Sequence, residues 1–381
     1  MRSISEEVLL LTQELIRFNT VNPPGQEEAC VAFLAKRLED AGLEVKTYAF
    51  SPGRPTLLAR LRGAGHKPPI CYTGHVDTVP LGDSPWRRDP FSGEADGDRL
   101  YGRGASDMKG GVAACVVSAM EMAGYPDRQA DILLVMTAGE ETGCEGAAHI
   151  ASLNGVLGEA GALVVAEPTS NRLCIGHKGV LWLEMETRGL AAHGSMPLEG
   201  VNAIYPAAEA ALKLREMDPG YPAHPFLGPA TLNVGTIAGG TRINMVPDQA
   251  VIQVDIRTVP GQASDETLGR LKTVLGPEVT IRVLLDFDAV ASDPDDPWIR
   301  EVSAVVSARS GGTASSEGLS YFTDASVLTP AFNSPPTIIL GPGDAEMAHK
   351  TDESCSISRL TEAVAIYTGI SRRWCTEAPV S

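Results

Sequence analysis

Five acidic or imidazole side chains stand in loops or where apolar stretches of the chain end, and together they could bind metal ions. Each one alone is weak evidence, because strand-end acids are more often caps or ion pairs and lone histidines are more often structural. Oxygen ligands mixed with imidazole suit zinc, with cobalt or manganese as substitutes. Two ions that share a carboxylate lie ~3.5–4 Å apart and can activate water and polarise a carbonyl group. The five residues are His75, Asp107, Glu141, Glu167 and His349.

His75 follows a short apolar stretch, residues 69–75, that is typical of a buried strand. Ligands of open α/β sheets bind beyond the carboxyl ends of the strands, where His75 would lie. Positions i and i+2 of an extended chain face the same side, so the side chain of Asp77 is expected to accept a hydrogen bond from His75. Such a bond fixes the tautomer of a metal-bound imidazole. A solvated turn is the alternative interpretation of His-x-Asp.

Asp107 is the central acid of a glycine-rich stretch, residues 102–111, that directly precedes an apolar helical pattern. Glycines permit tight backbone geometry around a ligand, so Asp107 is a candidate for a carboxylate that bridges two metal ions. A helix N-cap would explain the same residue. The spacing is not a nucleotide-binding fingerprint, because the third glycine is missing from its place.

Glu140 and Glu141 end the apolar stretch 131–141, and Glu167 lies at the end of a second one, 162–168. Adjacent side chains leave an extended chain in opposite directions, so we expect Glu141 to bind metal and Glu140 to hold the attacking water. Two acids at the end of a buried strand are costly unless they are paired or bind metal. His349 follows the loop 341–344. It becomes a candidate ligand only because the other four candidate residues occur in the same chain.

The elements that would position these residues alternate between helix and strand, which indicates an α/β domain with a mainly parallel sheet. The pattern changes after residue 178 to the order β-α-β-β-α-β, which is typical of a ferredoxin-like α+β domain. We therefore expect one domain of residues 1–177 and 291–381 with residues 178–290 inserted into it. Helices are expected at 5–18, 27–42, 110–124, 200–216 and 266–276, and strands at 44–50, 56–62, 69–75, 131–141, 162–168, 179–189, 231–237, 250–259, 279–287 and 337–341.

Charge and cysteine usage exclude several classes of partner. The chain has 381 residues with 31 Lys and Arg against 48 Asp and Glu, a net charge of −17, which argues against nucleic-acid binding. The seven cysteines include no Cys-x-x-Cys pair, so we expect reduced thiols and a cytoplasmic location. The N-terminus lacks the pattern of a signal peptide, and no apolar run is long enough to span a membrane.

The chain resembles the dinuclear zinc hydrolases that include acetylornithine deacetylase, succinyl-diaminopimelate desuccinylase, aminoacylase and glutamate carboxypeptidase. The resemblance implies that one zinc ion is bound by His75 and Glu167, and the other by Glu141 and His349. It also implies that Asp107 bridges the two ions, that Glu140 is the general base and that Asp77 orients His75. The motifs that carry it, in the family's order, are GHVDTVP, YGRGASDMKGG, AGEETG, VVAEPT, HGSMPLEGVNAI, INMVPDQA, DIRTVPG and MAHKTDE.

The resemblance also gives expectations for the inserted domain, which in the family mediates dimerisation and can close over the site. His193 is similar to a histidine that reaches the partner subunit's active site and stabilises the oxyanion. Asn244 and Arg257 match positions that hold the substrate, with Arg257 taking a carboxylate. Plainer interpretations stay open: a loop histidine for His193, a cap before Pro247 for Asn244, and an ion pair with Asp255 for Arg257.

The resemblance implies hydrolysis of the amide bond of N-acylated amino acids, with two zinc ions per subunit, in a homodimer. Glutamate at Glu167 goes with deacylases and carboxypeptidases in the family, and residues 176–179, Gly-His-Lys-Gly, look like the acetylornithine deacetylase branch. Succinyl-diaminopimelate desuccinylation and a glutamate carboxypeptidase activity are the alternatives. A non-catalytic metal-binding scaffold is a more remote alternative. A protein that only binds metal would not need a base such as Glu140 beside the ligands, and this chain has one.

Overall fold

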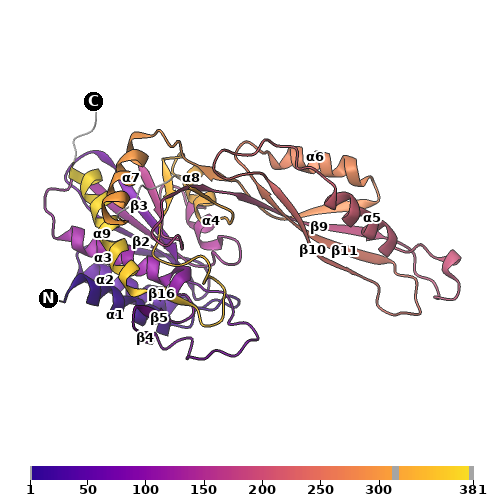
Figure 1. Cartoon of the computed structure of the whole chain (residues 1–381), viewed down its shortest axis with the longest axis horizontal. Helices are drawn as coiled ribbons and strands as arrows, with labels where there is room; N and C mark the ends of the chain where they lie inside the picture. Colours follow the sequence, from indigo (N-terminus) through magenta and orange to yellow (C-terminus); the bar gives the residue numbers. More distant parts are fainter. Residues whose placement is uncertain (1, 311–316, 377–381) are drawn as a thin grey trace. The chain divides into compact units, whose positions relative to one another are not determined.

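The computed structural model describes residues 2–310 and 317–376, and its chain clusters into two compact units (Figure 1). Unit 1 contains residues 1–176, 291–317 and 323–381, and unit 2 contains residues 177–290 and 318–322. Some of the first predicted domain lies outside the described residues, namely residue 1, residues 311–316 and residues 377–381. Residues 318–322, which the sequence analysis placed in the first domain, cluster with unit 2.

The described residues form a nine-stranded sheet in the order β1-β2-β6-β3-β7-β15-β8-β13, with β14 paired to β8. Most of it belongs to unit 1, and only end residues of β8, β13 and β14 cluster with unit 2. Its centre is parallel, because β3 pairs in parallel with β6 and β7, and β7 with β15. Antiparallel pairs flank this centre, so the predicted α/β class with a mainly parallel sheet is confirmed. The strands are β1 Glu44–Ser51, β2 Arg54–Leu61, β3 Lys67–His75, β6 Ala130–Thr137, β7 Ala162–Val165, β8 Cys174–His177, β13 Val290–Ala291, β14 Glu317–Leu319 and β15 Thr337–Ile339.

The register of the parallel strands brings the segments that follow them to one edge of the sheet. His75, the last residue of β3, pairs with Thr137, the last residue of β6. Thr73 of β3 pairs with Val165, the last residue of β7. The residues that follow β6 and β7 therefore emerge beside His75, as expected for the carboxyl ends of parallel strands.

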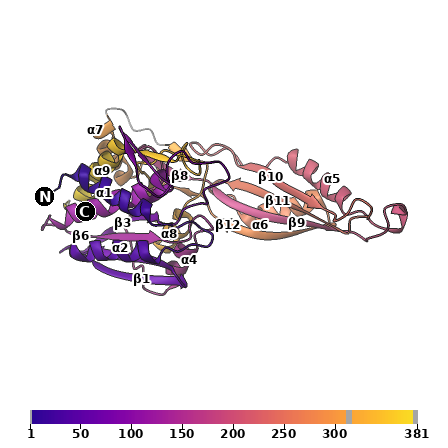
Figure 2. The ribbon, with the colours of Figure 1, turned by 90° about the horizontal axis from the view of Figure 1, so that it is seen from below.

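Helices α3 and α9 pack on each other and against strands β3 and β6, and α1 lies beside both helices (Figures 1 and 2). Helices α2 and α4 pack against β1 and β2. A Cβ atom at Gly111 would lie 2.1 Å from the carbonyl oxygen of Ala166, so only glycine lets α3 start this close to the end of β7. The helices of unit 1 are α1 Ile4–Arg17, α2 Glu28–Asp40, α3 Gly110–Ala123, α4 Glu145–Ser152, α7 Pro297–Ser310, α8 Ala325–Ala331 and α9 Ile357–Thr376.

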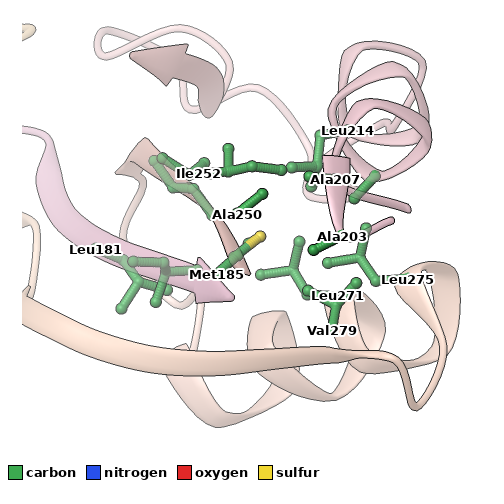
Figure 3. Close-up of a cluster of buried hydrophobic side chains, with 14 residues drawn as sticks. Leu181, Met185, Ala203, Ala207, Leu214, Ala250, Ile252, Leu271, Leu275 and Val279 are labelled. Atoms are coloured by element: carbon green, nitrogen blue, oxygen red, sulfur yellow. The ribbon is translucent and has the colours of Figure 1, made fainter. Parts of the chain in front are cut away.

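Unit 2 is an antiparallel sheet in the order β10-β11-β9-β12 with two helices, α5 and α6, against it. This order and the sequence β-α-β-β-α-β confirm the ferredoxin-like arrangement. Side chains of both helices and of three strands form its core (Figure 3). The elements are β9 Gly179–Arg188, α5 Ile204–Arg215, β10 Thr231–Gly239, β11 Gln249–Thr258, α6 Ser264–Leu275 and β12 Val279–Phe287.

Strand β6 is shorter than predicted, and this changes the geometry of the acids that follow it. It ends at Thr137, and Gly139 has a φ of 76°, so Glu140 and Glu141 lie in a turn rather than on an extended chain. The expectation that they point in opposite directions along a strand is therefore wrong.

All seven cysteines are buried and free. Among the residues that the structure describes, none of the helices combines the length and apolarity that a membrane crossing requires.

Candidate metal centre

His75 lies at the centre of a group of carboxylates at the end of β3. Its Nε2 atom is 3.1 Å from Oδ1 of Asp107 and 3.7 Å from Oε1 of Glu167. The imidazole is almost fully buried, with 1% of its surface exposed. Burial opposes a charge on this ring, but the hydrogen bond to Asp107 and the nearby carboxylates raise the pKa of His75 well above its usual value. His75 can thus share a cation with Asp107 and Glu141, or with Glu140 and Glu167, because the ligand atoms of each trio lie within 4.8 Å of one another.

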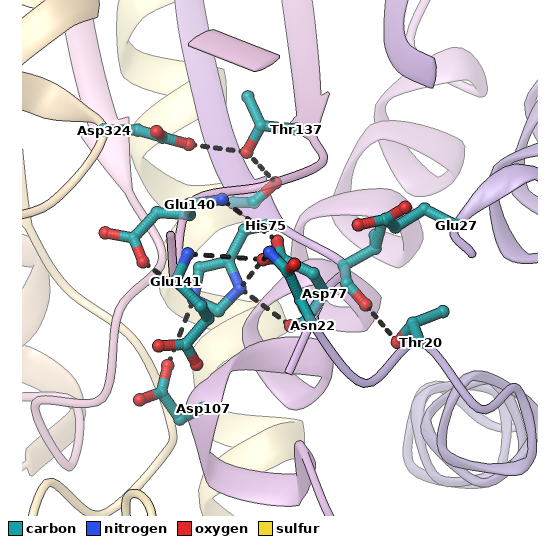
Figure 4. Close-up of polar contacts among 12 residues, drawn as sticks. Thr20, Asn22, Glu27, His75, Asp77, Asp107, Thr137, Glu140, Glu141 and Asp324 are labelled. Atoms are coloured by element: carbon teal, nitrogen blue, oxygen red, sulfur yellow. Dashed lines mark hydrogen bonds and ion pairs between the residues drawn. The ribbon is translucent and has the colours of Figure 1, made fainter. Parts of the chain in front are cut away.

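His349 forms a second such group on the other side of Asp107. Its Nε2 atom lies 3.3 Å from Oδ2 of Asp107 and 3.2 Å from Oε2 of Glu141. Hydrogen bonds to these two carboxylates raise the pKa of His349 to about 10. The two oxygens of Asp107 thus face different histidines, which is the arrangement a carboxylate needs to bridge two ions. Figure 4 shows Asp107 and Glu141 turned toward the ring of His75.

Asp107 does not cap the helix that follows it. Residues Ala105–Lys109 form a π-helical turn in which Asp107 has non-helical angles, φ −121° and ψ 95°, and the N-cap of α3 is Lys109. Burial works against the charge of Asp107, but the hydrogen bonds from His349 and His75 outweigh it and lower its pKa. Its side chain is therefore free of the capping role that was the alternative interpretation.

Asp77 supports His75 through its backbone rather than through its side chain. The Nδ1 atom of His75 lies 3.0 Å from the carbonyl oxygen of Asp77 but 3.6 Å from Oδ1. The carboxylate instead accepts the backbone N–H groups of Glu140 and Glu141, both at 3.2 Å, and the amide of Asn22 at 2.9 Å (Figure 4). The expected side-chain bond is thus replaced by a carbonyl bond, since the turn after β6 occupies the carboxylate.

Glu140 stands beside the candidate metal ligands, at a long distance from the ring of His75. Its Oε2 atom lies 4.0 Å from Nε2 of His75. Burial raises the pKa of Glu140 well above its usual value, helped by the charges of Glu167 and Glu141. A carboxyl group with a raised pKa can accept a proton and later release it near neutral pH, which is what general acid–base catalysis requires.

The residues present fit a pair of divalent cations. Burial raises the pKa of Glu167 and Glu141, so holding these carboxylates ionised requires positive charge that two histidines do not supply. The Oε1 atom of Glu141 is buried without a hydrogen-bond partner among the described residues. Unpaired buried carboxylate oxygens are costly unless they bind a cation. Oxygen and imidazole donors together suit zinc, and also cobalt or manganese.

The structure adds buried polar residues that the sequence analysis did not single out. Asp324 is 2% exposed and lies with Oδ2 at 2.5 Å from the hydroxyl of Thr137, whose strand leads to Glu140 (Figure 4). Glu353 is fully buried and receives hydrogen bonds from the loop that carries Asp107. Glu353 belongs to the quoted motif MAHKTDE, but a contact with a loop so distant in sequence leaves no local pattern to detect.

Three predicted site residues belong to unit 2. His193 is exposed in a loop, its Nδ1 atom 2.7 Å from the hydroxyl of Ser195. Asn244 lies beside it, because its carbonyl oxygen accepts the N–H of Gly194 at 2.8 Å. Arg257, on β11, pairs with Asp255 at 2.9 Å, the plainer interpretation of its role. The structure thus brings His193 and Asn244 together within unit 2, and the metal-binding candidates together within unit 1.

Comparisons with known proteins find a family model and curated relatives that match most of the chain. The family model described as peptidase family M20/M25/M40 matches residues 71–373. A probable succinyl-diaminopimelate desuccinylase of Staphylococcus epidermidis is 28% identical over 97% of this chain and 98% of its own. An acetylornithine deacetylase of Aliivibrio fischeri is 30% identical over 90% of each chain.

Solved structures share the fold. A tripeptidase from Staphylococcus aureus superposes with a TM-score of 0.80 at 21% identity, over 98% of this chain and 99% of that chain. A metallo-carboxypeptidase from Sulfolobus solfataricus superposes with a TM-score of 0.77 at 18% identity, over 97% and 99%. At such identities the likeness shows a common architecture.

Proposed function

Because the chain belongs to peptidase family M20/M25/M40, we propose that it is a two-zinc hydrolase that cleaves the amide bond of N-acylated amino acids, in the manner of acetylornithine deacetylase. The observation that carries the proposal is the position of Asp107 between two histidines, each of which also faces a second acid. Cobalt or manganese could replace zinc at these donors. We assign one ion to His75 and Glu167, the other to Glu141 and His349, and the bridge to Asp107.

The chain's own residues would move the protons of the reaction. When bound, the two ions supply a nucleophilic water at neutral pH and polarise the carbonyl group of the substrate. Glu140, buried beside the ligands, accepts the proton of the attacking water and delivers it to the leaving amine. Asp77 holds the turn of Glu140 and Glu141 through both backbone N–H groups, so the base and one ligand keep a fixed spacing.

We assign substrate contacts to unit 2, with His193 stabilising the oxyanion from the partner subunit and Asn244 and Arg257 holding the substrate. The ion pair with Asp255 fixes the guanidinium of Arg257, and a substrate carboxylate would have to share this guanidinium with Asp255.

Large apolar side chains of unit 2 that are unusually exposed support a homodimer through this unit, because such patches mark protein interfaces. These side chains are Leu190, Leu198, Val201, Tyr205, Leu212, Ile237 and Ile243.

We further propose a cytoplasmic location, which is supported by seven free, buried thiols, as is usual where disulfides do not form. The alternatives within the same chemistry are succinyl-diaminopimelate desuccinylation and a glutamate carboxypeptidase activity. The desuccinylase alternative is favoured by the S. epidermidis relative, which spans nearly the whole chain.

A substrate panel tests the proposal. The zinc-loaded protein would be assayed for amine release from N-acetylornithine, N-succinyl-diaminopimelate and a peptide with C-terminal glutamate, with the chelated protein as control. We expect the highest kcat/KM with the acetylated amino acid and no turnover after chelation. Turnover that survives chelation would overturn the metal mechanism, and preference for another substrate would select the corresponding alternative.

A further inference from the structure

The loop that carries Asp107 wraps around the side chain of Glu353. Oε1 of Glu353 accepts the backbone N–H groups of Ser106 at 2.8 Å and Asp107 at 2.9 Å. Oε2 accepts the N–H of Gly104 at 2.9 Å and the guanidinium of Arg103 at 2.8 Å. One buried carboxylate thus collects four donors from four nearby residues, including the backbone of the candidate bridging ligand.

Arg103 extends the same contact to two other loops of the site. Its Nη1 atom donates to the carbonyl of Lys350 at 3.1 Å, next to His349 in sequence. Its Nη2 atom donates to the carbonyl of Pro80 at 3.0 Å, in the loop that follows Asp77. The guanidinium lies over the ring of Trp86 at 5.0 Å, and 1% of its surface is exposed. One residue therefore joins the loop that follows His75 to the loops that carry Asp107 and His349.

We propose that the buried pair of Arg103 and Glu353 is a positioning device that sets the geometry of Asp107 and His349. It thereby sets the affinity of the second metal ion, which is the ion assigned to Glu141 and His349; the first is the ion assigned to His75 and Glu167. His75 lies at the end of a paired strand, which holds it independently of this pair. His349, by contrast, has a side chain that is 56% exposed and a backbone in the left-handed region, φ 61°, outside any strand or helix. The anchor at Lys350 is the contact next to it, so the ion between Asp107, Glu141 and His349 depends most on the pair.

Neutralising Glu353 tests the role without a change in size. In the E353Q variant the amide offers one oxygen for the four donors, so its NH₂ group must face donors from the loop of Asp107. Outer-shell partners of metal ligands typically change metal affinity by about 10–100-fold when they are mutated. We expect a loss of that size for the second ion and a smaller loss for the first.

Asp131 offers a matched control in the same unit. It accepts the N–H of Gly63 at 2.7 Å and the guanidinium of Arg60 at 2.9 Å, so it too joins a backbone donor to an arginine. It lies near the start of β6, away from the ligands, which follow the strand's end. D131N should therefore bind both ions with an affinity within about threefold of the unchanged protein, well inside the effect expected for Glu353.

The measurement is a titration of the metal-free full chain with Co²⁺ and Zn²⁺ against a chelator, together with the visible spectrum of bound Co²⁺, which reports ligand geometry. Circular dichroism would verify that each variant is folded. A weaker second step and an altered cobalt spectrum in E353Q, but not in D131N, support the proposal. A second-ion affinity within about threefold of the unchanged protein, or an equal loss in D131N, overturns it.

If E353Q does not fold, R103Q is judged by the same titration and the same limits, since it removes the anchors at Lys350 and Pro80 but leaves the backbone bonds of Glu353. The inference rests on the proposed metal site, and the two fail in different ways. If the unchanged chain binds no divalent ion, the proposed function fails. If it binds two and the variants match it, only the role of Arg103 and Glu353 fails.

Discussion

The Nε2 atom of His349 lies 3.2 Å from Oε2 of Glu141, although the two residues come from segments that the whole of unit 2 separates in sequence. The contact thus joins two parts of unit 1 that are distant in sequence.

Replacing His349 by alanine should remove one of the two metal ions, because Asp107 and Glu141 alone leave that ion with two protein ligands. Metal analysis after dialysis should give about one zinc per chain instead of two. H66A is the control, since His66 is exposed and lies at the opposite end of β3 from His75. Two tightly held ions in H349A would contradict the assignment of His349 as a ligand.

Replacing Glu140 by glutamine should lower kcat by about 10²–10⁴-fold, because the amide cannot carry the proton. The metal content should stay the same, since all five assigned ligands are intact. Steady-state kinetics and metal analysis of one preparation measure both quantities. E121Q, on the exposed surface of α3, should keep its rate. A near-normal kcat in fully loaded E140Q would end the general-base role.

The D77N variant separates the two ways in which Asp77 could support His75. The backbone carbonyl that accepts from Nδ1 is unchanged by this substitution, so the ion at His75 and Glu167 should keep its affinity. The turn of Glu140 and Glu141 loses a charged acceptor, so kcat should fall by about 10–100-fold. If D77N instead loses the first ion, the carboxylate and not the carbonyl fixes the imidazole.

Mixing two inactive variants tests the role of His193 in the partner subunit. Each of H193A and E140Q should be nearly inactive alone and dimeric in gel filtration. In a mixed dimer, the site with intact Glu140 receives intact His193 from the other subunit, so random mixing should restore about a quarter of the activity. No recovery on subunit exchange would place His193 within its own chain's site or outside catalysis.

Acid should destabilise the metal-free protein partly through His177. Burial lowers the pKa of this imidazole to about 4, against roughly 6.5 in an unfolded chain. Between these two pH values the unfolded state binds a proton that the folded state does not bind. The contribution of His177 to the free energy of unfolding is therefore complete above pH ~6.5, and it falls as the pH drops toward ~4, by up to about 3 kcal/mol. Urea unfolding of the chelated protein and of H177L should show a shallower decline in the variant. Equal declines would contradict the shift.

The sequence predicted the placement of the candidate ligands because strand ends can be recognised from apolar patterns, and the carboxyl ends of parallel strands share one edge of the sheet. His75 and Glu167 follow from that rule alone. The partner of the Asp77 carboxylate does not follow, because it depends on where β6 ends and how the chain turns at Gly139. The contacts of Glu353 could not be predicted for a related reason. Its four hydrogen-bond donors lie on a loop that is distant in sequence, and only tertiary packing brings them to Glu353.

The inserted domain has a consequence for how the enzyme is made. Strand β15, helix α9 and His349 are all encoded after unit 2, yet β15 lies between β7 and β8 in the sheet of unit 1. A nascent chain on the ribosome therefore holds four of the five candidate ligands while β7 still has an open edge. The site can be completed only after the segment that carries His349 has been synthesised and inserted, so the ion proposed for Glu141 and His349 would bind after the one proposed for His75 and Glu167.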